Sequence, residues 1–177
     1  MTASATVIAP PAADEYAPYY GRYISLVAPG DILDQLERQR EEMLARFRNV
    51  PESKGAHRYA PGKWSVRQVV LHLSDTERIM TYRALRIARG DATPLAGFDE
   101  NAYAPESGAD AVPLAELVGE FADVRRGSLA LFRHLPADAW TRRGTASDSP
   151  FSVRALAWVV VGHPIHHLGV LRDRYGV

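Results

Sequence analysis

Two histidines one helical turn apart near the C-terminus, His163 and His167, are the strongest chemical signal in this sequence. On an α-helix, residues i and i+4 share a face and lie about 6 Å apart along the axis, so both imidazoles can bind one metal ion. Such pairs also occur on solvated faces and as core histidines that hydrogen-bond to carbonyl groups. Here the strongly apolar stretch 158–161 precedes the pair and Leu168 follows it, so these imidazoles are expected to be buried and to need a partner.

A third histidine, His72, lies about ninety residues upstream, between Leu71 and Leu73. A lone buried histidine is more often a hydrogen-bonded core residue than a ligand. Three buried histidines on two helices of one small domain, however, can all be satisfied by a single divalent cation. We therefore predict that His72, His163 and His167 bind one metal ion and leave positions open for a non-protein ligand.

Spacing excludes two other metal chemistries that helical proteins use. Di-iron carboxylate bundles need Glu-x-x-His pairs, and no glutamate lies three residues before any of these histidines. A zincin needs His-Glu-x-x-His, whereas the sequence here is His163-Pro164-Ile165-His166-His167. The chain has no cysteine, so its metal ligands must be nitrogen or oxygen, and a thiol reaction would need an external thiol.

The other histidines are assigned different roles. His57 in a loop and His134 at a helix end are expected to be structural or solvated. His166 points about 100° away from His167, which favours packing or a subunit interface over metal binding. Pro164 removes a backbone hydrogen bond inside a helix, so we expect a kink over residues 162–164.

Four amphipathic segments with apolar residues at helical spacing account for most of the chain, and no convincing strand alternation is present. The predicted helices cover about residues 31–49, 65–90, 113–135 and 152–176. The connection 91–112 is long for a bundle, and residues 140–150 are predicted to form a polar loop. The predicted fold is all-α, a four-helix bundle with a long crossover between helices two and three.

Local start signals support these helices. Asp31 and Ser152 are suitable N-caps, and Ser65 with Gln68 forms a capping box. Pro113 suits the first turn of the third helix.

Composition limits the class of protein. The 177 residues, 46% of them hydrophobic, fit one globular domain, which we place at 16–177 after a flexible tail over 1–15. Aromatic side chains in 15–27 are expected to hold that segment against the domain. With 21 basic and 21 acidic residues the net charge is zero, which argues against nucleic acid or an anionic membrane as a partner. No signal peptide or membrane-spanning run is evident, so a cytoplasmic location is expected.

Five stretches together carry a family resemblance. They are Gly62-Lys63-Trp64-Ser65-Val66-Arg67, His72-Leu73-Ser74-Asp75, Tyr82-Arg83, Phe98-Asp99-Glu100-Asn101-Ala102-Tyr103 and Gly162-His163-Pro164-Ile165-His166-His167. Over about residues 16–177 the chain resembles the DinB superfamily, close to its YfiT-like branch of metal-dependent hydrolases. The resemblance implies a four-helix bundle, often a homodimer, with zinc or nickel on three histidines, which by position are His72, His163 and His167. Pro164 departs from the family pattern, because relatives often have glutamate there.

The resemblance also implies enzymes of two kinds, hydrolases and transferases or isomerases that use low-molecular-weight thiols such as bacillithiol and mycothiol. A metal on three histidines lowers the pKa of bound water to near 7 or binds an external thiol as thiolate. Candidate groups around that nucleophile are Asp75, Arg83, and Asn101 or Tyr103 from the crossover. Asp75 is alternatively an acceptor that orients a ligand imidazole, or an ordinary surface charge.

We predict a metal-dependent enzyme, a hydrolase or a thiol-dependent transferase, that acts on a small-molecule substrate. Two alternatives stay open. One is a non-catalytic metal-binding or small-ligand-binding protein associated with stress, and the other is bis-histidine haem binding.

Overall fold

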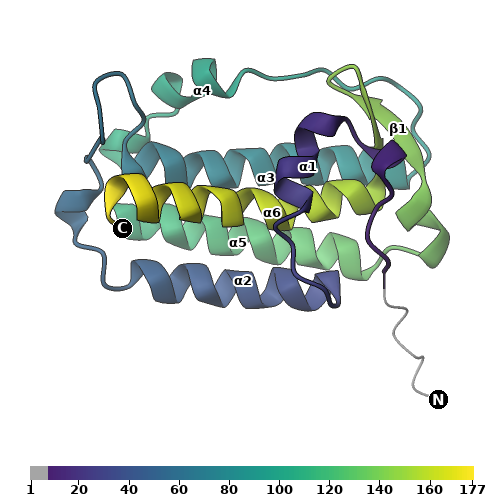
Figure 1. Cartoon of the computed structure of the whole chain (residues 1–177), viewed down its shortest axis with the longest axis horizontal. Coiled ribbons are helices and arrows are strands. Elements are labelled where there is room, and N and C mark those ends of the chain that lie inside the picture. The colour runs from purple at the N-terminus through teal and green to yellow at the C-terminus, as the bar shows by residue number, and fades with distance from the viewer. Residues whose placement is uncertain (1–7) are drawn as a thin grey trace.

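The computed structural model describes residues 8–177, and four long helices packed side by side dominate it (Figure 1). These helices are α2 (Ile32–Phe47), α3 (Val66–Ala88), α5 (Leu114–Arg133) and α6 (Val153–Val170). Helix α5 packs against α2 and α3, and α6 packs against α3 and α2, which closes the bundle. The predicted all-α fold, a four-helix bundle with a long crossover between its second and third helices, is confirmed.

The helix starts follow the local signals in the sequence. Asp31 accepts hydrogen bonds from two backbone N–H groups at the start of α2, at 2.7 and 3.3 Å. Ser65 and Gln68 form the predicted reciprocal capping box of α3. Ser152 caps α6 through a 3.0 Å hydrogen bond from Ala155 N. Pro113 occupies the N-cap position of α5, one residue earlier than expected.

Shorter helices lie around the four long helices. The crossover contains α4 (Glu100–Glu106), which lies apart from the bundle axis above α3, and the N-terminal segment contains α1 (Gly21–Ile24), which crosses α6 (Figure 1). Single helical turns cover Ala13–Glu15, Pro18–Tyr20, Glu52–Lys54, Ala109–Ala111 and Ala137–Thr141, and a π-helical turn, Leu171–Tyr175, continues α6.

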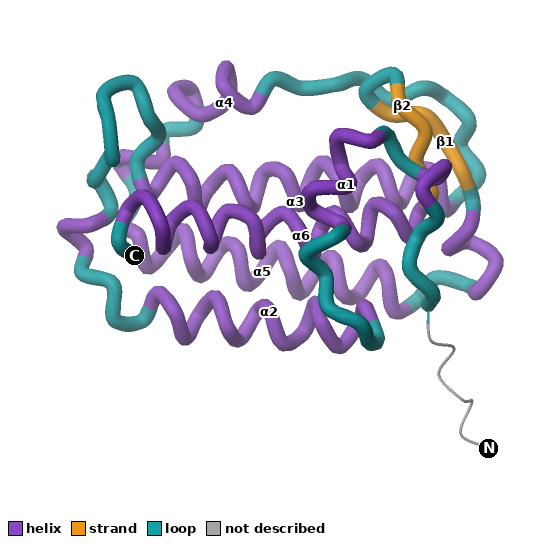
Figure 2. The backbone as a smooth tube through the Cα atoms, viewed as in Figure 1, coloured by secondary structure: helices purple, strands orange, loops and turns teal. Residues whose placement is uncertain are grey.

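The polar loop predicted for 140–150 is wrong. An antiparallel hairpin of β1 (Arg143–Ala146) and β2 (Ser149–Ser152) lies at one end of the bundle (Figure 2). Each strand has four residues, too few for alternation to be recognised in the sequence. Ser147 and Asp148 connect the strands with φ of 51° and 55°, the left-handed conformation that tight hairpins require at both turn positions.

The N-terminal segment packs against the bundle, as expected for residues 15–27. Residues 1–7 of the expected flexible tail lie outside the described residues. Glu15, however, is buried, with an ion pair to Arg154 and a 2.6 Å hydrogen bond from Ser152 Oγ. Tyr23 in α1 is also buried, as the aromatic pattern predicted. Its backbone lies so close to α6 that a Cβ at Gly162 would be 2.1 Å from the Tyr23 carbonyl oxygen, so this crossing requires glycine.

The hydrophobic core divides into two clusters along the bundle axis, one at each end. Between them, each helix contributes a buried polar group: Gln39 from α2, Glu77 from α3, Arg125 from α5 and His163 from α6. We call these four residues the polar layer. No helix among residues 8–177 is long and apolar enough to span a membrane.

Candidate metal centre

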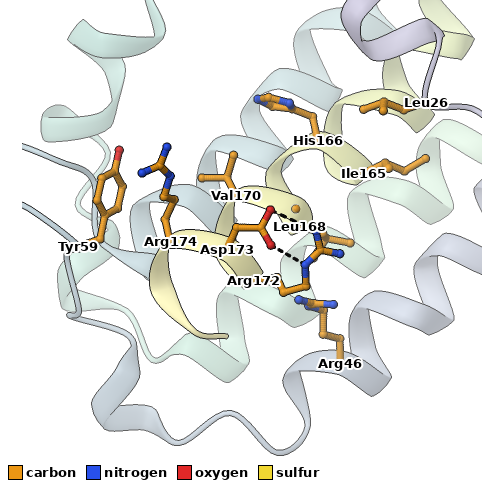
Figure 3. A pocket seen from close by; sticks show the side chains of 11 residues that line it. Leu26, Arg46, Tyr59, Ile165, His166, Leu168, Val170, Arg172, Asp173 and Arg174 are labelled. Atoms are coloured by element: carbon orange, nitrogen blue, oxygen red, sulfur yellow. Dashed lines mark hydrogen bonds and ion pairs between the residues drawn. The ribbon is translucent and has the colours of Figure 1, made fainter.

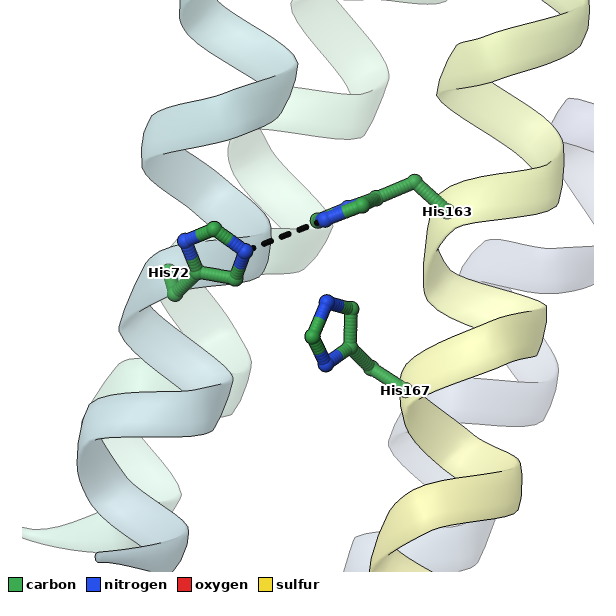
Figure 4. A group of neighbouring side chains, drawn as sticks. All are labelled: His72, His163 and His167. Carbon is green, nitrogen blue, oxygen red and sulfur yellow. Dashed lines mark hydrogen bonds between the residues drawn. The ribbon is translucent and has the colours of Figure 1, made fainter. Parts of the chain in front are cut away.

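Three histidines from two helices converge next to the polar layer, of which His163 is itself a member. His72 lies on α3, and His163 and His167 lie one turn apart on α6, with their rings directed toward one another (Figure 4). One ring nitrogen from each lies within 4.8 Å of the others. The predicted ligand residues are therefore brought together.

Two of these nitrogens are close enough to share a metal ion. His72 Nε2 and His163 Nε2 are 3.0 Å apart. Two imidazole nitrogens at a Zn–N distance of about 2.0–2.1 Å lie about 2.9 Å apart at a right angle and about 3.4 Å apart at the tetrahedral angle of zinc. A hydrogen bond between the two rings would also give a distance of 3.0 Å, but such a bond does not explain why the His167 ring is directed toward them as well.

Burial keeps the three imidazoles neutral, the form that binds metal. It lowers the pKa of His72 to about 4 and, together with the other histidines, lowers the pKa of His167 to about 3. The pKa of His163, the most deeply buried of the three, lies well below its ordinary value for the same reasons. Neutral imidazole without a carboxylate ligand suits zinc, nickel or another divalent transition metal.

Neighbouring side chains hold the rings in place. Thr76 Oγ1 lies 3.4 Å from His72 Nδ1, on the side away from the other histidines' nitrogens. The Trp64 ring packs 4.8 Å from His72, and the Tyr23 ring packs 5.3 Å from His163. Trp64 is itself held by Tyr175, whose hydroxyl donates to the Trp64 carbonyl at 2.8 Å.

The polar layer gives partners to the α6 backbone next to His163. Pro164 has no N–H, so the Val160 carbonyl cannot receive its usual helical hydrogen bond. Arg125 Nη2 donates to that oxygen at 3.0 Å, and Gln39 Nε2 donates to the next carbonyl, of Val161, at 2.9 Å. Helix α6 continues through Pro164 to Val170. The kink expected at residues 162–164 stays a prediction.

Glu77 completes the polar layer. Its carboxylate accepts two hydrogen bonds from Arg125, at 2.8 and 2.7 Å, and both side chains are at most 2% exposed. Gln39 Oε1 accepts a third hydrogen bond from Arg125 at 2.5 Å. The buried guanidinium is therefore neutralised by Glu77 and held by α2, α3 and α6 together.

A pocket of about 410 Å³ opens onto the three histidines. Its size is within the roughly 300–1,000 Å³ typical of small-molecule sites. The charged side chains that line it are Arg22 from α1 and Glu100 from α4. Burial, and to a smaller extent Tyr19 and the Glu100 carboxylate, raise the pKa of the Tyr23 hydroxyl, which keeps this phenol protonated.

The structure places the predicted catalytic residues around the site but not in its pocket. Asp75 is turned toward Arg78, at 3.3 Å, and burial raises its pKa. Arg83 is buried and donates to Ala96 O and Ser147 Oγ, both at 2.8 Å. Tyr103 is half exposed and packs on Phe98 at 5.6 Å.

Asn101, the crossover alternative to Tyr103, does line the pocket. Sequence reasoning missed Glu100, Arg22, Thr76 and Trp64 as site residues. Glu100 stands in the motif Phe98–Tyr103, so the signal was available there. Nothing in the sequence indicated that α1, which carries Arg22, would reach the histidines.

The remaining histidines occupy other positions. His57 and His134 are exposed, as expected. His166 is partly buried, with its ring 5.4 Å from the Tyr23 ring, and burial and the charge of Arg22 lower its pKa. It also borders a shallower hollow of about 780 Å³ along the outer face of α6 (Figure 3). None of the three converging histidines lines that hollow, so the metal chemistry belongs to the smaller pocket.

Comparisons with known proteins agree with this fold. The sequence model of the DinB superfamily matches residues 35–171. A comparison with curated proteins finds no match. Among solved structures, YfiT from Bacillus subtilis, described as a probable metal-dependent hydrolase with an unusual four-helix bundle topology, superposes with a TM-score of 0.73. The two chains are 19% identical, and the match covers 85% of this chain and 90% of YfiT, which shows a shared fold.

Proposed function

The chain belongs to the DinB superfamily, and we propose that it is a metal-dependent enzyme whose divalent ion is held by His72, His163 and His167. The observation that carries the proposal is the convergence of three neutral imidazoles at the bottom of an open pocket. A purely structural site is usually closed by four protein ligands, whereas three ligands leave room for a substrate or water. The description of YfiT as a probable metal-dependent hydrolase agrees with this proposal.

A divalent ion on three imidazoles supplies Lewis acidity, which makes water or a thiol reactive as a nucleophile near neutral pH. Zinc or nickel is the ion that we expect, given the nitrogen ligands. The residues of the chain have separate tasks. Thr76 fixes the orientation of the His72 ring through Nδ1, and the Trp64 and Tyr23 rings exclude water from the sides of the two imidazoles they cover.

Glu100 favours hydrolysis over thiol transfer. It is the carboxylate that lines the pocket, and none of the ion pairs among the described residues uses it. A carboxylate in this position can accept a proton from attacking water and return it to the leaving group. We assign this role to Glu100 in place of Asp75, which is engaged by Arg78. A low-molecular-weight thiol as second substrate, and a homodimer as the active form, remain proposals.

The test begins with metal analysis of purified full-length protein. Wild type is expected to retain one zinc or nickel ion per chain, and His72→Ala, His163→Ala and His167→Ala are each expected to lose it. His57→Ala, which changes an exposed histidine, is the matched control and should retain the metal. Stoichiometric metal in all three site variants would refute the ligand assignment.

Activity is then measured on the metal-loaded protein with aryl ester and amide substrates, each with and without an added thiol. Hydrolysis without thiol, abolished in Glu100→Gln at unchanged metal content, is the expected result. Turnover only in the presence of thiol would favour the transferase. No turnover under either condition would favour a non-catalytic metal-binding protein.

A further inference from the structure

We propose that the natural substrate of this pocket carries a carboxylate on an aromatic or apolar body, and that Arg22 binds the carboxylate. The proposal rests on the proposed function, because it concerns the ligand of the same site. It assigns Arg22 as a specificity-determining residue that contacts the substrate at the end opposite the metal.

Arg22 is an exposed cation that contacts Tyr19 and has no ion-pair partner among residues 8–177. Its Nε donates to the Tyr19 carbonyl at 3.2 Å, and its guanidinium lies 3.6 Å from the centre of the Tyr19 ring. These two contacts hold the guanidinium plane but leave its terminal nitrogens free. Many arginines of residues 8–177 are neutralised by a carboxylate, as Arg125 is by Glu77, whereas Arg22 takes part in none of the ion pairs found there. A planar guanidinium whose terminal Nη1–Nη2 edge is free matches a carboxylate in a bidentate arrangement.

Tyr23 connects this cation to the metal centre. The Tyr23 ring centre is 5.4 Å from the Arg22 guanidinium and 5.3 Å from the His163 ring centre. These two distances put the guanidinium no more than about 11 Å from the His163 ring centre. A molecule of one ring and a short chain can span such a distance, and the pocket volume of about 410 Å³ accommodates it.

The walls between these two ends are aromatic. Tyr19, Tyr20, Trp64 and Phe98 line the pocket together with Tyr23. Ring faces of this kind favour a flat apolar or aromatic body, since they gain from stacking as well as from burial. The walls alone would accept a neutral ligand, so the charge preference has to come from Arg22.

Glu100 determines which way round the ligand lies. Its carboxylate lines the same pocket and would repel a second carboxylate placed beside it. A ligand carboxylate is therefore favoured at Arg22 over a position beside Glu100, which leaves the other end of the ligand for the histidines.

The experiment compares two probes of one shape, 3-phenylpropionate and its neutral amide, by isothermal titration calorimetry with zinc-loaded full-length protein. Wild type is expected to bind the acid about ten-fold more tightly than the amide, at the lower end of what a charge-assisted hydrogen bond contributes at an accessible site. Arg22→Gln should bind both probes with nearly equal affinity, and Arg22→Lys should keep part of the preference because it retains the charge without the planar fork.

Arg126→Gln, which removes an exposed arginine on α5 away from the pocket, is the matched control and should keep the full preference. Equal affinities in wild type, binding of neither probe in the millimolar range, or a preference that survives in Arg22→Gln would each overturn the assignment.

The metal-free variant His163→Ala separates this inference from the proposed function. Arg22-dependent preference for the acid in that variant would support the carboxylate site even if the protein proved to have no metal-dependent activity. A preference that is lost in His163→Ala but kept in Arg22→Gln would mean that the carboxylate binds at the metal, and would overturn the role of Arg22. Circular dichroism of each variant confirms that the compared proteins are folded.

Discussion

Replacing Pro164 with alanine is expected to have a more favourable effect on stability in a chain that lacks Arg125 than in wild type. In wild type the Val160 carbonyl already accepts a hydrogen bond from Arg125 at 3.0 Å, so an N–H at residue 164 adds little. In an Arg125→Met background that oxygen has lost its side-chain donor. Alanine at 164 then restores the helical hydrogen bond that proline cannot make.

The magnitude follows from the groups that are left unpaired. Arg125→Met alone leaves the Glu77 carboxylate buried without its partner, which costs about 3–5 kcal/mol, and also leaves the Val160 oxygen unsatisfied. The double-mutant cycle removes the Glu77 contribution, because Glu77 is orphaned whether residue 164 is proline or alanine. The remaining coupling is the cost of one buried unsatisfied carbonyl, about 1–2 kcal/mol.

The assay is urea unfolding of wild type, Arg125→Met, Pro164→Ala and the double variant, all in EDTA so that metal binding does not contribute. The double variant should be more stable than the sum of the single effects predicts. A parallel cycle of Arg154→Met with Pro164→Ala is the control, since Arg154 pairs with Glu15 and does not donate to Val160. Additivity within about 0.5 kcal/mol in the Arg125 cycle would refute the idea that Arg125 replaces the donor missing at Pro164.

Three further predictions concern the histidines and α6. Between pH 6.5 and about 4, His72 and His167 are protonated in the unfolded chain but stay neutral in the folded chain. The unfolding free energy of the metal-free protein therefore falls as pH falls, by up to about 1.4 kcal/mol per pH unit for each histidine. Urea unfolding at pH 7 and pH 5 measures this change, and equal stabilities at the two pH values would contradict the burial of these rings. Thr76→Val removes the group that contacts His72 Nδ1, so chelator competition should show a metal Kd raised about ten-fold, and an unchanged Kd would mean that the contact does not orient the ring. Gly162→Ala forces a Cβ against the α1 backbone and should lower the unfolding free energy by about 3 kcal/mol in urea titrations. The control Gly169→Ala has open space at its Cβ position and should not lower the unfolding free energy. Equal effects of the two substitutions would refute the close crossing of α1 and α6.

The helices and the convergence of the three histidines were predictable because both depend on local patterns in the sequence. Asp31, Ser65 and Ser152 act within three or four residues of their own positions, and apolar spacing of three and four is independent of the tertiary fold. His163 and His167 share a helix face for the same reason. The prediction that His72 lies next to them required one further assumption, that buried histidines on two helices of a small domain meet at one point.

The residues around the ligands were harder to predict, because their positions depend on three-dimensional placement. Arg83 lies 11 residues after His72, on nearly the same face of α3 but roughly 16 Å further along the helix axis, too far to reach the three histidines. Asp75 is offset from His72 by about 60° around the axis, whereas Thr76, at i+4, is offset by about 40° and does contact the ring. The rise along the axis therefore separates Arg83 from the histidines, and the angular offset distinguishes Asp75 from Thr76. Catalytic roles for Asp75 and Arg83 stay predictions.

The polar layer explains why α6 tolerates two residues that weaken a helix. Gly162 admits the backbone of α1, which places Tyr23 over His163, and Pro164 frees a carbonyl that Arg125 then holds. A buried ion pair such as Arg125 with Glu77 contributes little net stability, because desolvation offsets most of the attraction, and apolar residues of similar volume would often fill the space at least as well. What apolar residues cannot supply is a donor for the carbonyls before His163. We infer that the role of the polar layer is to position the α6 backbone, because its side chains hold the carbonyls just before His163, the residue that α6 directs into the pocket.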